Sequence, residues 1–355
     1  MKFPNELFVS DKADGHVQGI AVDEDVGVIY LSLTTKLIKA DFSGKILASV
    51  KNLAGHLGCI TLDKDRGRIY GSLELKHDVI GQSIIARTGW DPSAMDSFYI
   101  VSFDLSKMTG IDMDAERDGV MTAMFIADVA ADYAADDPVS NMKHRYGCSG
   151  MDGTAYGPVF GESADSRKKI MTAYGIYSEC SRADNDNQLI LQFDPDDIDK
   201  YARPLSQSEP HRSGPEHAER RYFLYTGNTS FGVQNLEYDE YSRLWLVAVY
   251  PGEKEKYSNF NIYFIDGTQA PTVGEVHGRE GEEGLILTLA KVGERDKSGE
   301  NIYGIRFPSG DTGIVSLGEG DFCFSIPHSD RKRGVFGSTV IRCKLNKDTG
   351  EITRY

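Results

Sequence analysis

The sequence lacks the features that mark several large classes of protein. It has only five cysteines, an odd number, and no Cys-x-x-Cys pair, so we expect neither a disulfide framework nor a zinc knuckle. No apolar run approaches the roughly 18 residues that a transmembrane helix needs, and the N-terminal residues do not resemble a signal peptide. The sequence therefore predicts a soluble cytoplasmic protein with no membrane partner.

Basic residues are also scarce. The chain of 355 residues contains 39 Lys and Arg against 54 Asp and Glu, which gives a formal net charge of -15. A protein of this charge repels a phosphate backbone, so we expect no nucleic acid partner. The motifs of P-loop nucleotidases, HExxH metalloproteases, GxSxG hydrolases and EF-hand proteins are missing as well, which excludes the functions that depend on them.

One local pattern is present five times, and it determines the predicted fold. It consists of a polar or Gly-rich entry, four strand-like residues, a turn and a long apolar strand. The copies at 16–23 and 56–63 match almost residue for residue, and weaker copies occupy 150–157, 232–239 and 311–318. Such repeats indicate supersecondary units that bury their apolar faces against one another.

Each copy is followed by two more segments rich in β-branched and aromatic residues, so each unit has four strands. In the fourth unit the last strand is expected at 285–289. The sequence thus predicts an all-β fold, a single-domain five-bladed β-propeller with four antiparallel strands per blade and long B–C loop insertions on one face. The expected limits are about 14–51, 55–130, 147–226, 230–291 and 303–355 for blades one to five within 1–355, with residues 5–10 helping to close the last blade.

Three short segments carry a resemblance to known proteins. The segments 146–153, 174–177 and 183–187 resemble a block of uncharacterised bacterial β-propeller proteins of the NHL and YVTN-repeat type. The resemblance covers most of the chain and implies the propeller fold. It implies no particular reaction, because propellers carry unrelated activities on one scaffold.

Most of the length beyond a minimal blade lies between the second and third strands, B and C, of each unit. Five units in 355 residues average 71 residues, against roughly 40–45 in a compact blade. The surplus is concentrated at 75–97, 178–187, 251–259 and 327–337. In a propeller these loops share one face with the entries of the inner strands, so we expect a binding site at that axial mouth.

The entry residues would form a polar ring around the axis. In chain order its members are His16, Gln18, His56, Gly58, Gly150, Asp152, Gly232, Gln234, Asn235, Asp311 and Gly313. One hypothesis makes His16, His56 and Asp152 ligands of one divalent metal ion, because imidazole and carboxylate together suit zinc, manganese or iron; Asp311 could replace Asp152. The ion would polarise a carbonyl or phosphoryl group and activate water. The alternative is that these residues only cap turns.

A second hypothesis needs no metal. Asp152 and Asp311, with Glu74 or Glu179, would be the acid and base of a glycosidase, which needs two carboxylates roughly 5–10 Å apart. Cationic residues on the loops would favour an anionic ligand, and aromatic residues such as Trp90 would pack against a sugar ring. The predicted ligand-binding residues are Gln18, Gln234, Asn235, Lys76, Arg182, Tyr250, His328 and Arg331.

These observations together predict a protein that binds a small polar ligand, anionic or carbohydrate-like, at the axial mouth. In the catalytic form of the hypothesis it is a hydrolase or lyase assisted by one divalent metal ion, with Asp152, Asp311 and Glu74 as catalytic residues. The alternative is a non-catalytic scaffold for protein interactions, which would present a broad apolar or charged patch away from the mouth.

Overall fold

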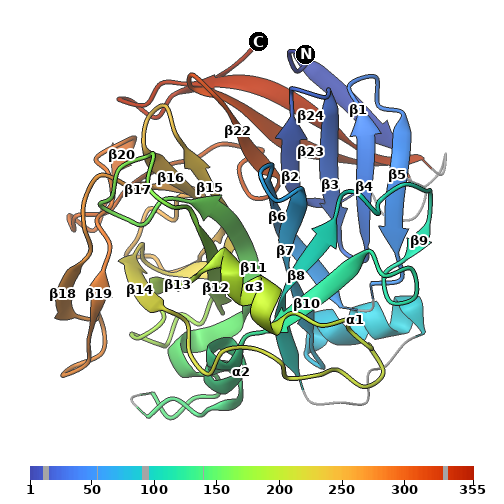
Figure 1. Cartoon of the computed structure of the whole chain (residues 1–355). Helices are drawn as coiled ribbons and strands as arrows, with labels where there is room; N and C mark the ends of the chain where they lie inside the picture. Colours follow the sequence, from blue (N-terminus) through green and yellow to red (C-terminus); the bar gives the residue numbers. More distant parts are fainter. Residues whose placement is uncertain (11–15, 54, 90–95, 139, 331–334) are drawn as a thin grey trace.

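The structure confirms the predicted architecture. This computed structural model describes residues 1–10, 16–53, 55–89, 96–138, 140–330 and 335–355. Five mainly antiparallel sheets surround a central axis as a five-bladed β-propeller (Figure 1). The five inner strands lie side by side along the axis. We call the end at which the inner strands begin the entry end, and the opposite end the exit end.

Blades one and two have four consecutive strands each. From the axis outward, blade one contains β2 (Val17–Asp23), β3 (Val28–Leu33), β4 (Lys36–Asp41) and β5 (Ile46–Lys51), with β9 (Met113–Asp114) paired in parallel at its outer edge. Blade two contains β6 (His56–Asp63), β7 (Arg68–Leu75), β8 (Ser97–Asp104) and β10 (Met121–Phe125). The turns after β2 and β6 end on Gly27 and Gly67, whose φ angles of 68° and 61° lie in the left-handed region that glycine adopts at no steric cost.

Blades three and four carry additional short strands at their outer edges. Blade three contains β11 (Cys148–Gly157), β12 (Lys169–Ile176), β13 (Asn187–Phe193), β14 (Arg220–Tyr225), β19 (Glu283–Ile286) and β18 (Thr272–Glu275). Blade four contains β15 (Thr229–Asp239), β16 (Leu244–Pro251), β17 (Ile262–Asp266), β21 (Tyr303–Ile305) and β20 (Glu294–Arg295).

The prediction for the last strand of blade four, 285–289, is wrong in part. Its first half belongs to β19, where Leu285 and Ile286 pair in parallel with β14 of blade three. Only Leu289 bridges to blade four, opposite Ile265. Within this apolar run the chain passes from the outer edge of blade three to the outer part of blade four, so the run pairs with strands of both blades. The fourth strand of blade four is β21, which lies in a segment that the sequence assigned to blade five.

Both ends of the chain contribute to blade five. This blade contains β22 (Ile314–Gly318), β23 (Asp321–Asp330) and β24 (Val335–Leu345), and both β1 (Glu6–Ser10) and β25 (Ile352–Arg354) pair with β24. Leu7 lies opposite Val340, and Ile352 lies opposite Leu345. The two termini therefore lie near each other, as Figure 1 shows.

Apolar side chains fill the spaces between neighbouring blades. Between blades three and four, for example, the buried ring of Trp245 lies 5.1 Å from that of Phe160. The helices are short: α1 (Val79–Thr88), α2 (Ala127–Ala134), α3 (Pro195–Tyr201) and a 3-10 turn (Arg145–Gly147). In the part of the chain that the structure describes, no helix is both long and apolar enough to cross a bilayer. All five cysteines are free thiols.

Candidate functional site

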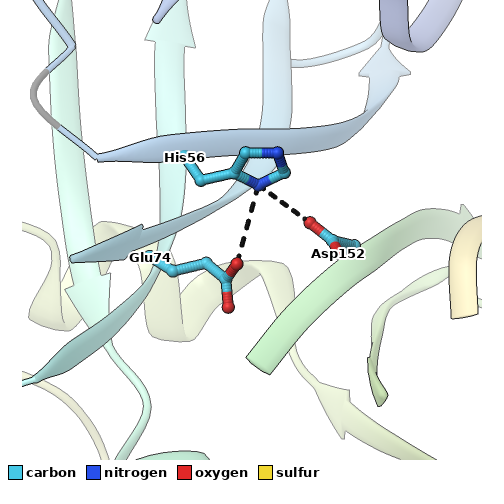
Figure 2. A group of neighbouring side chains, drawn as sticks. All are labelled: His56, Glu74 and Asp152. Atoms are coloured by element: carbon cyan, nitrogen blue, oxygen red, sulfur yellow. Dashed lines mark ion pairs between the residues drawn. The ribbon is translucent and has the colours of Figure 1, made fainter. Parts of the chain in front are cut away.

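Three side chains from two blades meet at the entry end. His56 begins β6, and the antiparallel register places it directly opposite Glu74 on β7. Asp152 comes from β11, the inner strand of blade three. Nδ1 of His56 lies 3.0 Å from Oδ1 of Asp152 and 3.6 Å from Oε1 of Glu74 (Figure 2). We call these three residues the entry triad.

Two glycines make room for the entry triad. A Cβ atom at Gly58 would lie 2.8 Å from Oδ1 of Asp152 and would also contact the Ser72 hydroxyl. Gly150 has a φ of 140°, and a Cβ atom there would overlap the Glu74 carboxylate and approach the Lys76 ammonium. Glycine at both positions therefore lets carboxylates approach the backbone of the inner strands closely.

Lys76 holds Glu74 in place. Its ammonium lies 3.2 Å from Oε1 of Glu74 and 3.3 Å from Oδ2 of Asp78, and it donates a hydrogen bond of 2.8 Å to the carbonyl of Ser149. The other carboxylate oxygen of Glu74 accepts a hydrogen bond of 2.7 Å from the backbone N–H of Met151. Lys76 is 5% exposed, so it is a structural partner of Glu74 at the base of the site.

The pKa values of the entry triad reflect burial and mutual charge. Burial, partly offset by Lys76, raises the pKa of Glu74 to about 7. Burial alone would lower the pKa of His56, but the neighbouring carboxylates of Asp152 and Glu74 outweigh it and raise that pKa. Burial also opposes ionisation of Asp152, yet the charges of His56 and Lys76 lower its pKa. Glu74 therefore titrates near neutral pH, while Asp152 remains ionised beside His56.

Several buried polar atoms of the entry end have no directed hydrogen bond. Among the described residues, no hydrogen-bond partner with suitable geometry reaches Nδ1 of His56, Oδ1 of Asp152 or Nε2 of Gln234. Gln234 is only 5% exposed, and it lies on β15, the next inner strand after that of Asp152. Buried polar groups in native proteins are nearly always hydrogen-bonded, so unsatisfied atoms at one place indicate a missing ligand, ion or water.

Other residues of the predicted ring lie in a second group. Nε2 of His16 is 3.4 Å from the hydroxyl oxygen of Tyr250, and Asp311 accepts a hydrogen bond of 2.7 Å from the amide of Asn261. Burial raises the pKa of Tyr250, and the charges of Asp152 and Asp311 raise it further. Burial also raises the pKa of Asp311, against the effects of Asn261 and His16. His16 thus faces Tyr250 and lies outside the entry triad.

The metal ligands predicted from the sequence therefore divide between the two groups. Among the described residues, His56, Glu74 and Asp152 form the group whose ligand atoms lie within 4.8 Å of one another, the spacing that one ion requires. The sequence assigned His16 to the metal and Glu74 to catalysis. Counting the antiparallel register back from the turn at 64–67 would have placed Leu57 opposite Glu74. A β-bulge between Leu57 and Ile60 shifts the register by one residue and brings His56 opposite Glu74, which the sequence does not show.

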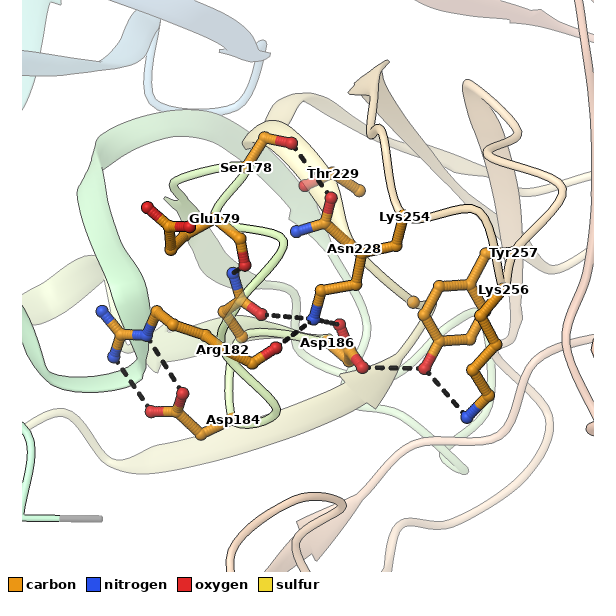
Figure 3. A network of polar contacts seen from close by, with 12 residues as sticks. Ser178, Glu179, Arg182, Asp184, Asp186, Asn228, Thr229, Lys254, Lys256 and Tyr257 are labelled. Carbon is orange, nitrogen blue, oxygen red and sulfur yellow. Dashed lines mark hydrogen bonds and ion pairs between the residues drawn. The ribbon is translucent and has the colours of Figure 1, made fainter. Parts of the chain in front are cut away.

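Arg182 does not line the axial mouth. Its guanidinium is buried, forms an ion pair of 2.9 Å with Asp184 and donates to backbone carbonyls of the loop before β11. Figure 3 shows the network around it, in which the Lys254 ammonium donates to the carbonyl of Arg182 and to Asp186. Arg182 and Lys254 are thus neutralised within the B–C loops of blades three and four.

The remaining predicted ligand-binding residues have structural roles or lie elsewhere. The Asn235 amide donates 2.6 Å to the Gln18 carbonyl and accepts from the backbone N–H of Ile314, so it connects three inner strands. His328 is exposed on β23 and contacts the hydroxyl of Thr339. Arg331 and Trp90 lie outside the described residues.

Comparisons with known proteins add little to this description. No family model matches the chain, and neither does any curated protein. Three solved structures are similar at low level. A functionally unknown protein from Desulfotomaculum acetoxidans has a TM-score of 0.34 and 11% identity, and the match covers 98% of this chain and 68% of that one. A calcium structure of a Trichoderma reesei carbohydrate-active enzyme of family AA12 has a TM-score of 0.42 and 12% identity, with 94% and 81% covered. An oligogalacturonate lyase in complex with manganese has a TM-score of 0.34 and 11% identity, with 91% and 75% covered. We draw no functional conclusion from similarities this low, and the resemblance to NHL and YVTN-repeat proteins stays a prediction.

Proposed function

We propose that the entry end binds a divalent cation through His56, Glu74 and Asp152, and through that cation a small polar ligand. The ligand class is anionic or carbohydrate-like, and the chemistry is that of a hydrolase or lyase. The observation that carries this proposal is the position of Nδ1 of His56, 3.0 Å and 3.6 Å from two carboxylate oxygens without a directed hydrogen bond. One imidazole nitrogen and two carboxylate oxygens suit manganese, zinc or iron.

The charges at the site support a cation as the first component of binding. Without an ion, the two carboxylates of Glu74 and Asp152 are balanced by Lys76 and by a protonated His56. An ion that displaces the proton of His56 gives the site an excess positive charge. This excess positive charge would attract an anionic ligand. The ion would have to supply the attraction, since Arg182 and Lys254 are already paired within their loops.

Neighbouring side chains can position a ligand above the triad. Gln234 offers a buried amide donor, and Tyr250 offers a hydroxyl beside the imidazole of His16. The ring of Phe231 lies 6.1 Å from that of Tyr250 and is 40% exposed, so a sugar ring can pack against it. A bound cation would supply Lewis acidity. The Tyr250 and His16 pair would then donate or accept a proton at the ligand.

A second candidate function uses the same residues without a metal. Burial raises the pKa of Glu74 to about 7 although Lys76 lowers it, so a fraction of Glu74 is protonated at neutral pH. A carboxylic acid of this kind, beside the ionised Asp152, is suited to general acid catalysis at neutral pH. The glycosidase hypothesis from the sequence takes this form, with Glu74 and Asp152 in place of the pair Asp152 and Asp311.

Metal titration separates the two candidates. Protein freed of metal with a chelator would be titrated calorimetrically with Mn²⁺, Zn²⁺ and Ca²⁺, and elemental analysis would be run on untreated protein. We expect binding of at least one ion, weakened about tenfold or more in H56A, E74Q and D152N, because H56A removes a donor atom and E74Q and D152N replace an anionic oxygen donor with a weaker neutral amide. The matched control is H217A, since His217 is 74% exposed and pairs with Asp128. If no ion binds, or if the three variants bind as the wild type does, the metal proposal is wrong and the acid–base candidate takes its place.

A further inference from the structure

A second cavity lies at the exit end of the axis, opposite the entry triad. Its volume is about 490 Å³. All five inner strands contribute to its wall, with Ala21 from β2, Thr61 from β6, Tyr156 from β11, Glu237 from β15 and Ser316 from β22. The cavity is therefore a feature of the propeller axis, and none of the residues of the entry triad lines it.

Glu237 is the exception in the repeat at this level of the axis. The equivalent positions of the five copies are Ala21, Thr61, Ala155, Glu237 and Ser316. Blades one, two and five thus place a small side chain on the cavity wall where blade four places a carboxylate, and in blade three Ala155 is buried in the core while its neighbour Tyr156 lines the cavity. The small side chains leave space beside the axis, and Glu237 lines the cavity that results.

The carboxylate of Glu237 has little compensation within the protein. Its Oε1 accepts a hydrogen bond of 2.9 Å from the backbone N–H of Ser316. Among the described residues, no Lys, Arg or His nitrogen lies within ion-pair distance of it. Burial, with a contribution from Asp239, raises the pKa of this carboxyl to about 8, although the Ser316 hydrogen bond and Lys168 lower it. A positive charge in the cavity would stabilise the ionised form.

Asp63 provides a second buried carboxylate on the wall. It is 1% exposed, and no directed hydrogen bond from a described residue reaches its Oδ2. The nearest cation, Nε of Arg66, is 3.7 Å away, and the other nitrogens of Arg66 are bound to Asp196 and Asp199 at 2.5 Å and 2.7 Å. Oδ1 of Asp63 accepts a hydrogen bond of 3.1 Å from the backbone N–H of Arg66. Asp63 therefore shares one guanidinium with Asp196 and Asp199, so its negative charge is only partly compensated.

The cavity has an excess of negative charge. Its walls contain the acidic residues Glu24, Asp25, Asp63, Asp65, Glu237 and Glu240, and the basic residues Lys64 and Lys168. Lys64 already pairs with Asp23 and Asp25, at 3.0 Å and 2.8 Å, and Lys168 lies 3.8 Å from Glu240. These lysines therefore do not neutralise Glu237 or Asp63, and the charge of the cavity is complementary to a cation.

The spacing of the acidic groups distinguishes between kinds of cation. Within the described part of the chain, the His–Glu–Asp group of the entry end is where three ligand side chains come close enough to share one ion. The exit carboxylates are more widely separated, and the volume of about 490 Å³ is far larger than a bare ion needs. Tyr156 and Tyr238 also line the cavity, and aromatic walls suit alkylammonium groups.

We propose that the exit cavity binds a small organic amine, whose ammonium group contacts Glu237 while its alkyl chain or a second amino group lies toward Asp63. This site is independent of the proposed function of the entry end. Binding requires no covalent step, since it consists of charge-assisted hydrogen bonds in a partly enclosed space.

The test is calorimetric titration of the full-length protein with putrescine and spermidine at about 0.15 M salt, where long-range attraction by the net charge of -15 is screened. We expect binding that weakens about tenfold or more in E237Q and in D63N. E216Q is the matched control, because the Glu216 side chain is 92% exposed and does not line the cavity, and H56A tests independence from the entry end. Neither control should change the affinity. Thermal melting without ligand checks that each variant is folded, and E237A serves as a second variant if E237Q is not.

Three results would overturn the proposal. The first is an absence of binding by both amines in folded wild-type protein. The second is binding that E237Q and D63N leave unchanged, which would show attraction by overall charge only. The third is competition by Mg²⁺ or Ca²⁺ at micromolar concentration, which would identify the occupant as a metal ion. H56A removes a ligand of the entry site and not of the cavity, so failure of one proposal is distinguishable from failure of the other.

Discussion

His56 and Glu74 are cross-strand neighbours in blade two, and Nδ1 of the imidazole lies 3.6 Å from Oε1 of the carboxylate. Blade one has a histidine at the same repeat position but not this pair. There Val17 lies opposite Leu33, so the register places Thr34 where blade two has Glu74. The residue opposite His16 in its own blade is therefore a threonine and not a carboxylate. The entry triad forms at the junction of blades two and three because a histidine at the entry, a glutamate opposite it and an aspartate on the next inner strand meet there.

Replacement of Gly58 tests the close approach on which the triad depends. In G58A the new Cβ would lie 2.8 Å from Oδ1 of Asp152, so the carboxylate must move away from His56. We expect a loss of about 1–3 kcal/mol in unfolding free energy and a loss of about tenfold or more in Mn²⁺ affinity. Urea denaturation and calorimetry measure the two effects. The control is G274A, whose Cβ would make an ordinary contact of 3.5 Å with Ile286. Unchanged metal affinity in G58A would contradict the prediction.

The fold was predictable because its main signal is local. The repeat at 16–23 and 56–63 contains the entry, the inner strand and the turn in one short window, and the register next to the turn follows from it. A β-bulge near each entry then shifts the register by one residue. The outer strands were less predictable. The run 285–289 has the composition of one strand, but which blade edge it covers depends on the path of the chain between two blades. Sequence pattern does not contain that information.

The candidate site was predictable in its residues more than in its pairings. The repeat indicated that His56 and Asp152 lie at the same end of the axis, and the structure places them 3.0 Å apart. Arg182 illustrates the opposite case. Its charge suggested an exposed anion-binding group, but Asp184 two residues later neutralises it within a buried loop. A sequence shows that a side chain is charged but not which residue pairs with it. Because Arg182 and Asp184 are buried as a pair, the charge of Arg182 does not reach the binding surface.

Metal binding should strengthen as the pH rises. The pKa of His56 is raised above its ordinary value and that of Glu74 is raised to about 7, so both ligands hold protons at pH 6. An ion must displace these protons, because only the deprotonated groups coordinate. We expect Mn²⁺ affinity to increase about tenfold or more between pH 6 and pH 8, with protons released on binding. Calorimetry in buffers of different ionisation enthalpy measures the release. An affinity that does not change with pH would be inconsistent with coordination by this triad.

The loop network of blades three and four should contribute stability without contributing to ligand binding. Lys254 is 9% exposed, and its ammonium contacts Asn185 and Asp186 at 2.8 Å each. In K254M a buried carboxylate and amide lose their partner, which should lower the unfolding free energy by about 3–5 kcal/mol. K256M is the control, since the Lys256 side chain is 53% exposed. Its exposed ion pair should contribute no more than about 1 kcal/mol. Urea denaturation of both variants compares the losses, and equal losses would contradict a structural role for Lys254.

Glu237 should make the protein less stable as the pH rises. Its pKa in the folded protein is about 8, above the ordinary value of 4.5, so folding favours the protonated carboxyl. The stabilisation from that bound proton is complete below about pH 4.5 and is lost as the pH rises through 8, because the unfolded chain ionises first. The groups that influence this titration are Asp239 on the same strand, Lys168, and the backbone N–H of Ser316 on β22. E237Q cannot ionise, so its stability relative to the wild type should increase by about 3 kcal/mol between pH 5.5 and pH 8.5. Urea denaturation of both proteins at the two pH values gives this difference directly. E240Q should show no comparable change, because Glu240 is exposed. A difference between E237Q and the wild type that stays constant with pH would mean that Glu237 is ionised throughout this range, as it would be if a cation within the protein compensated it.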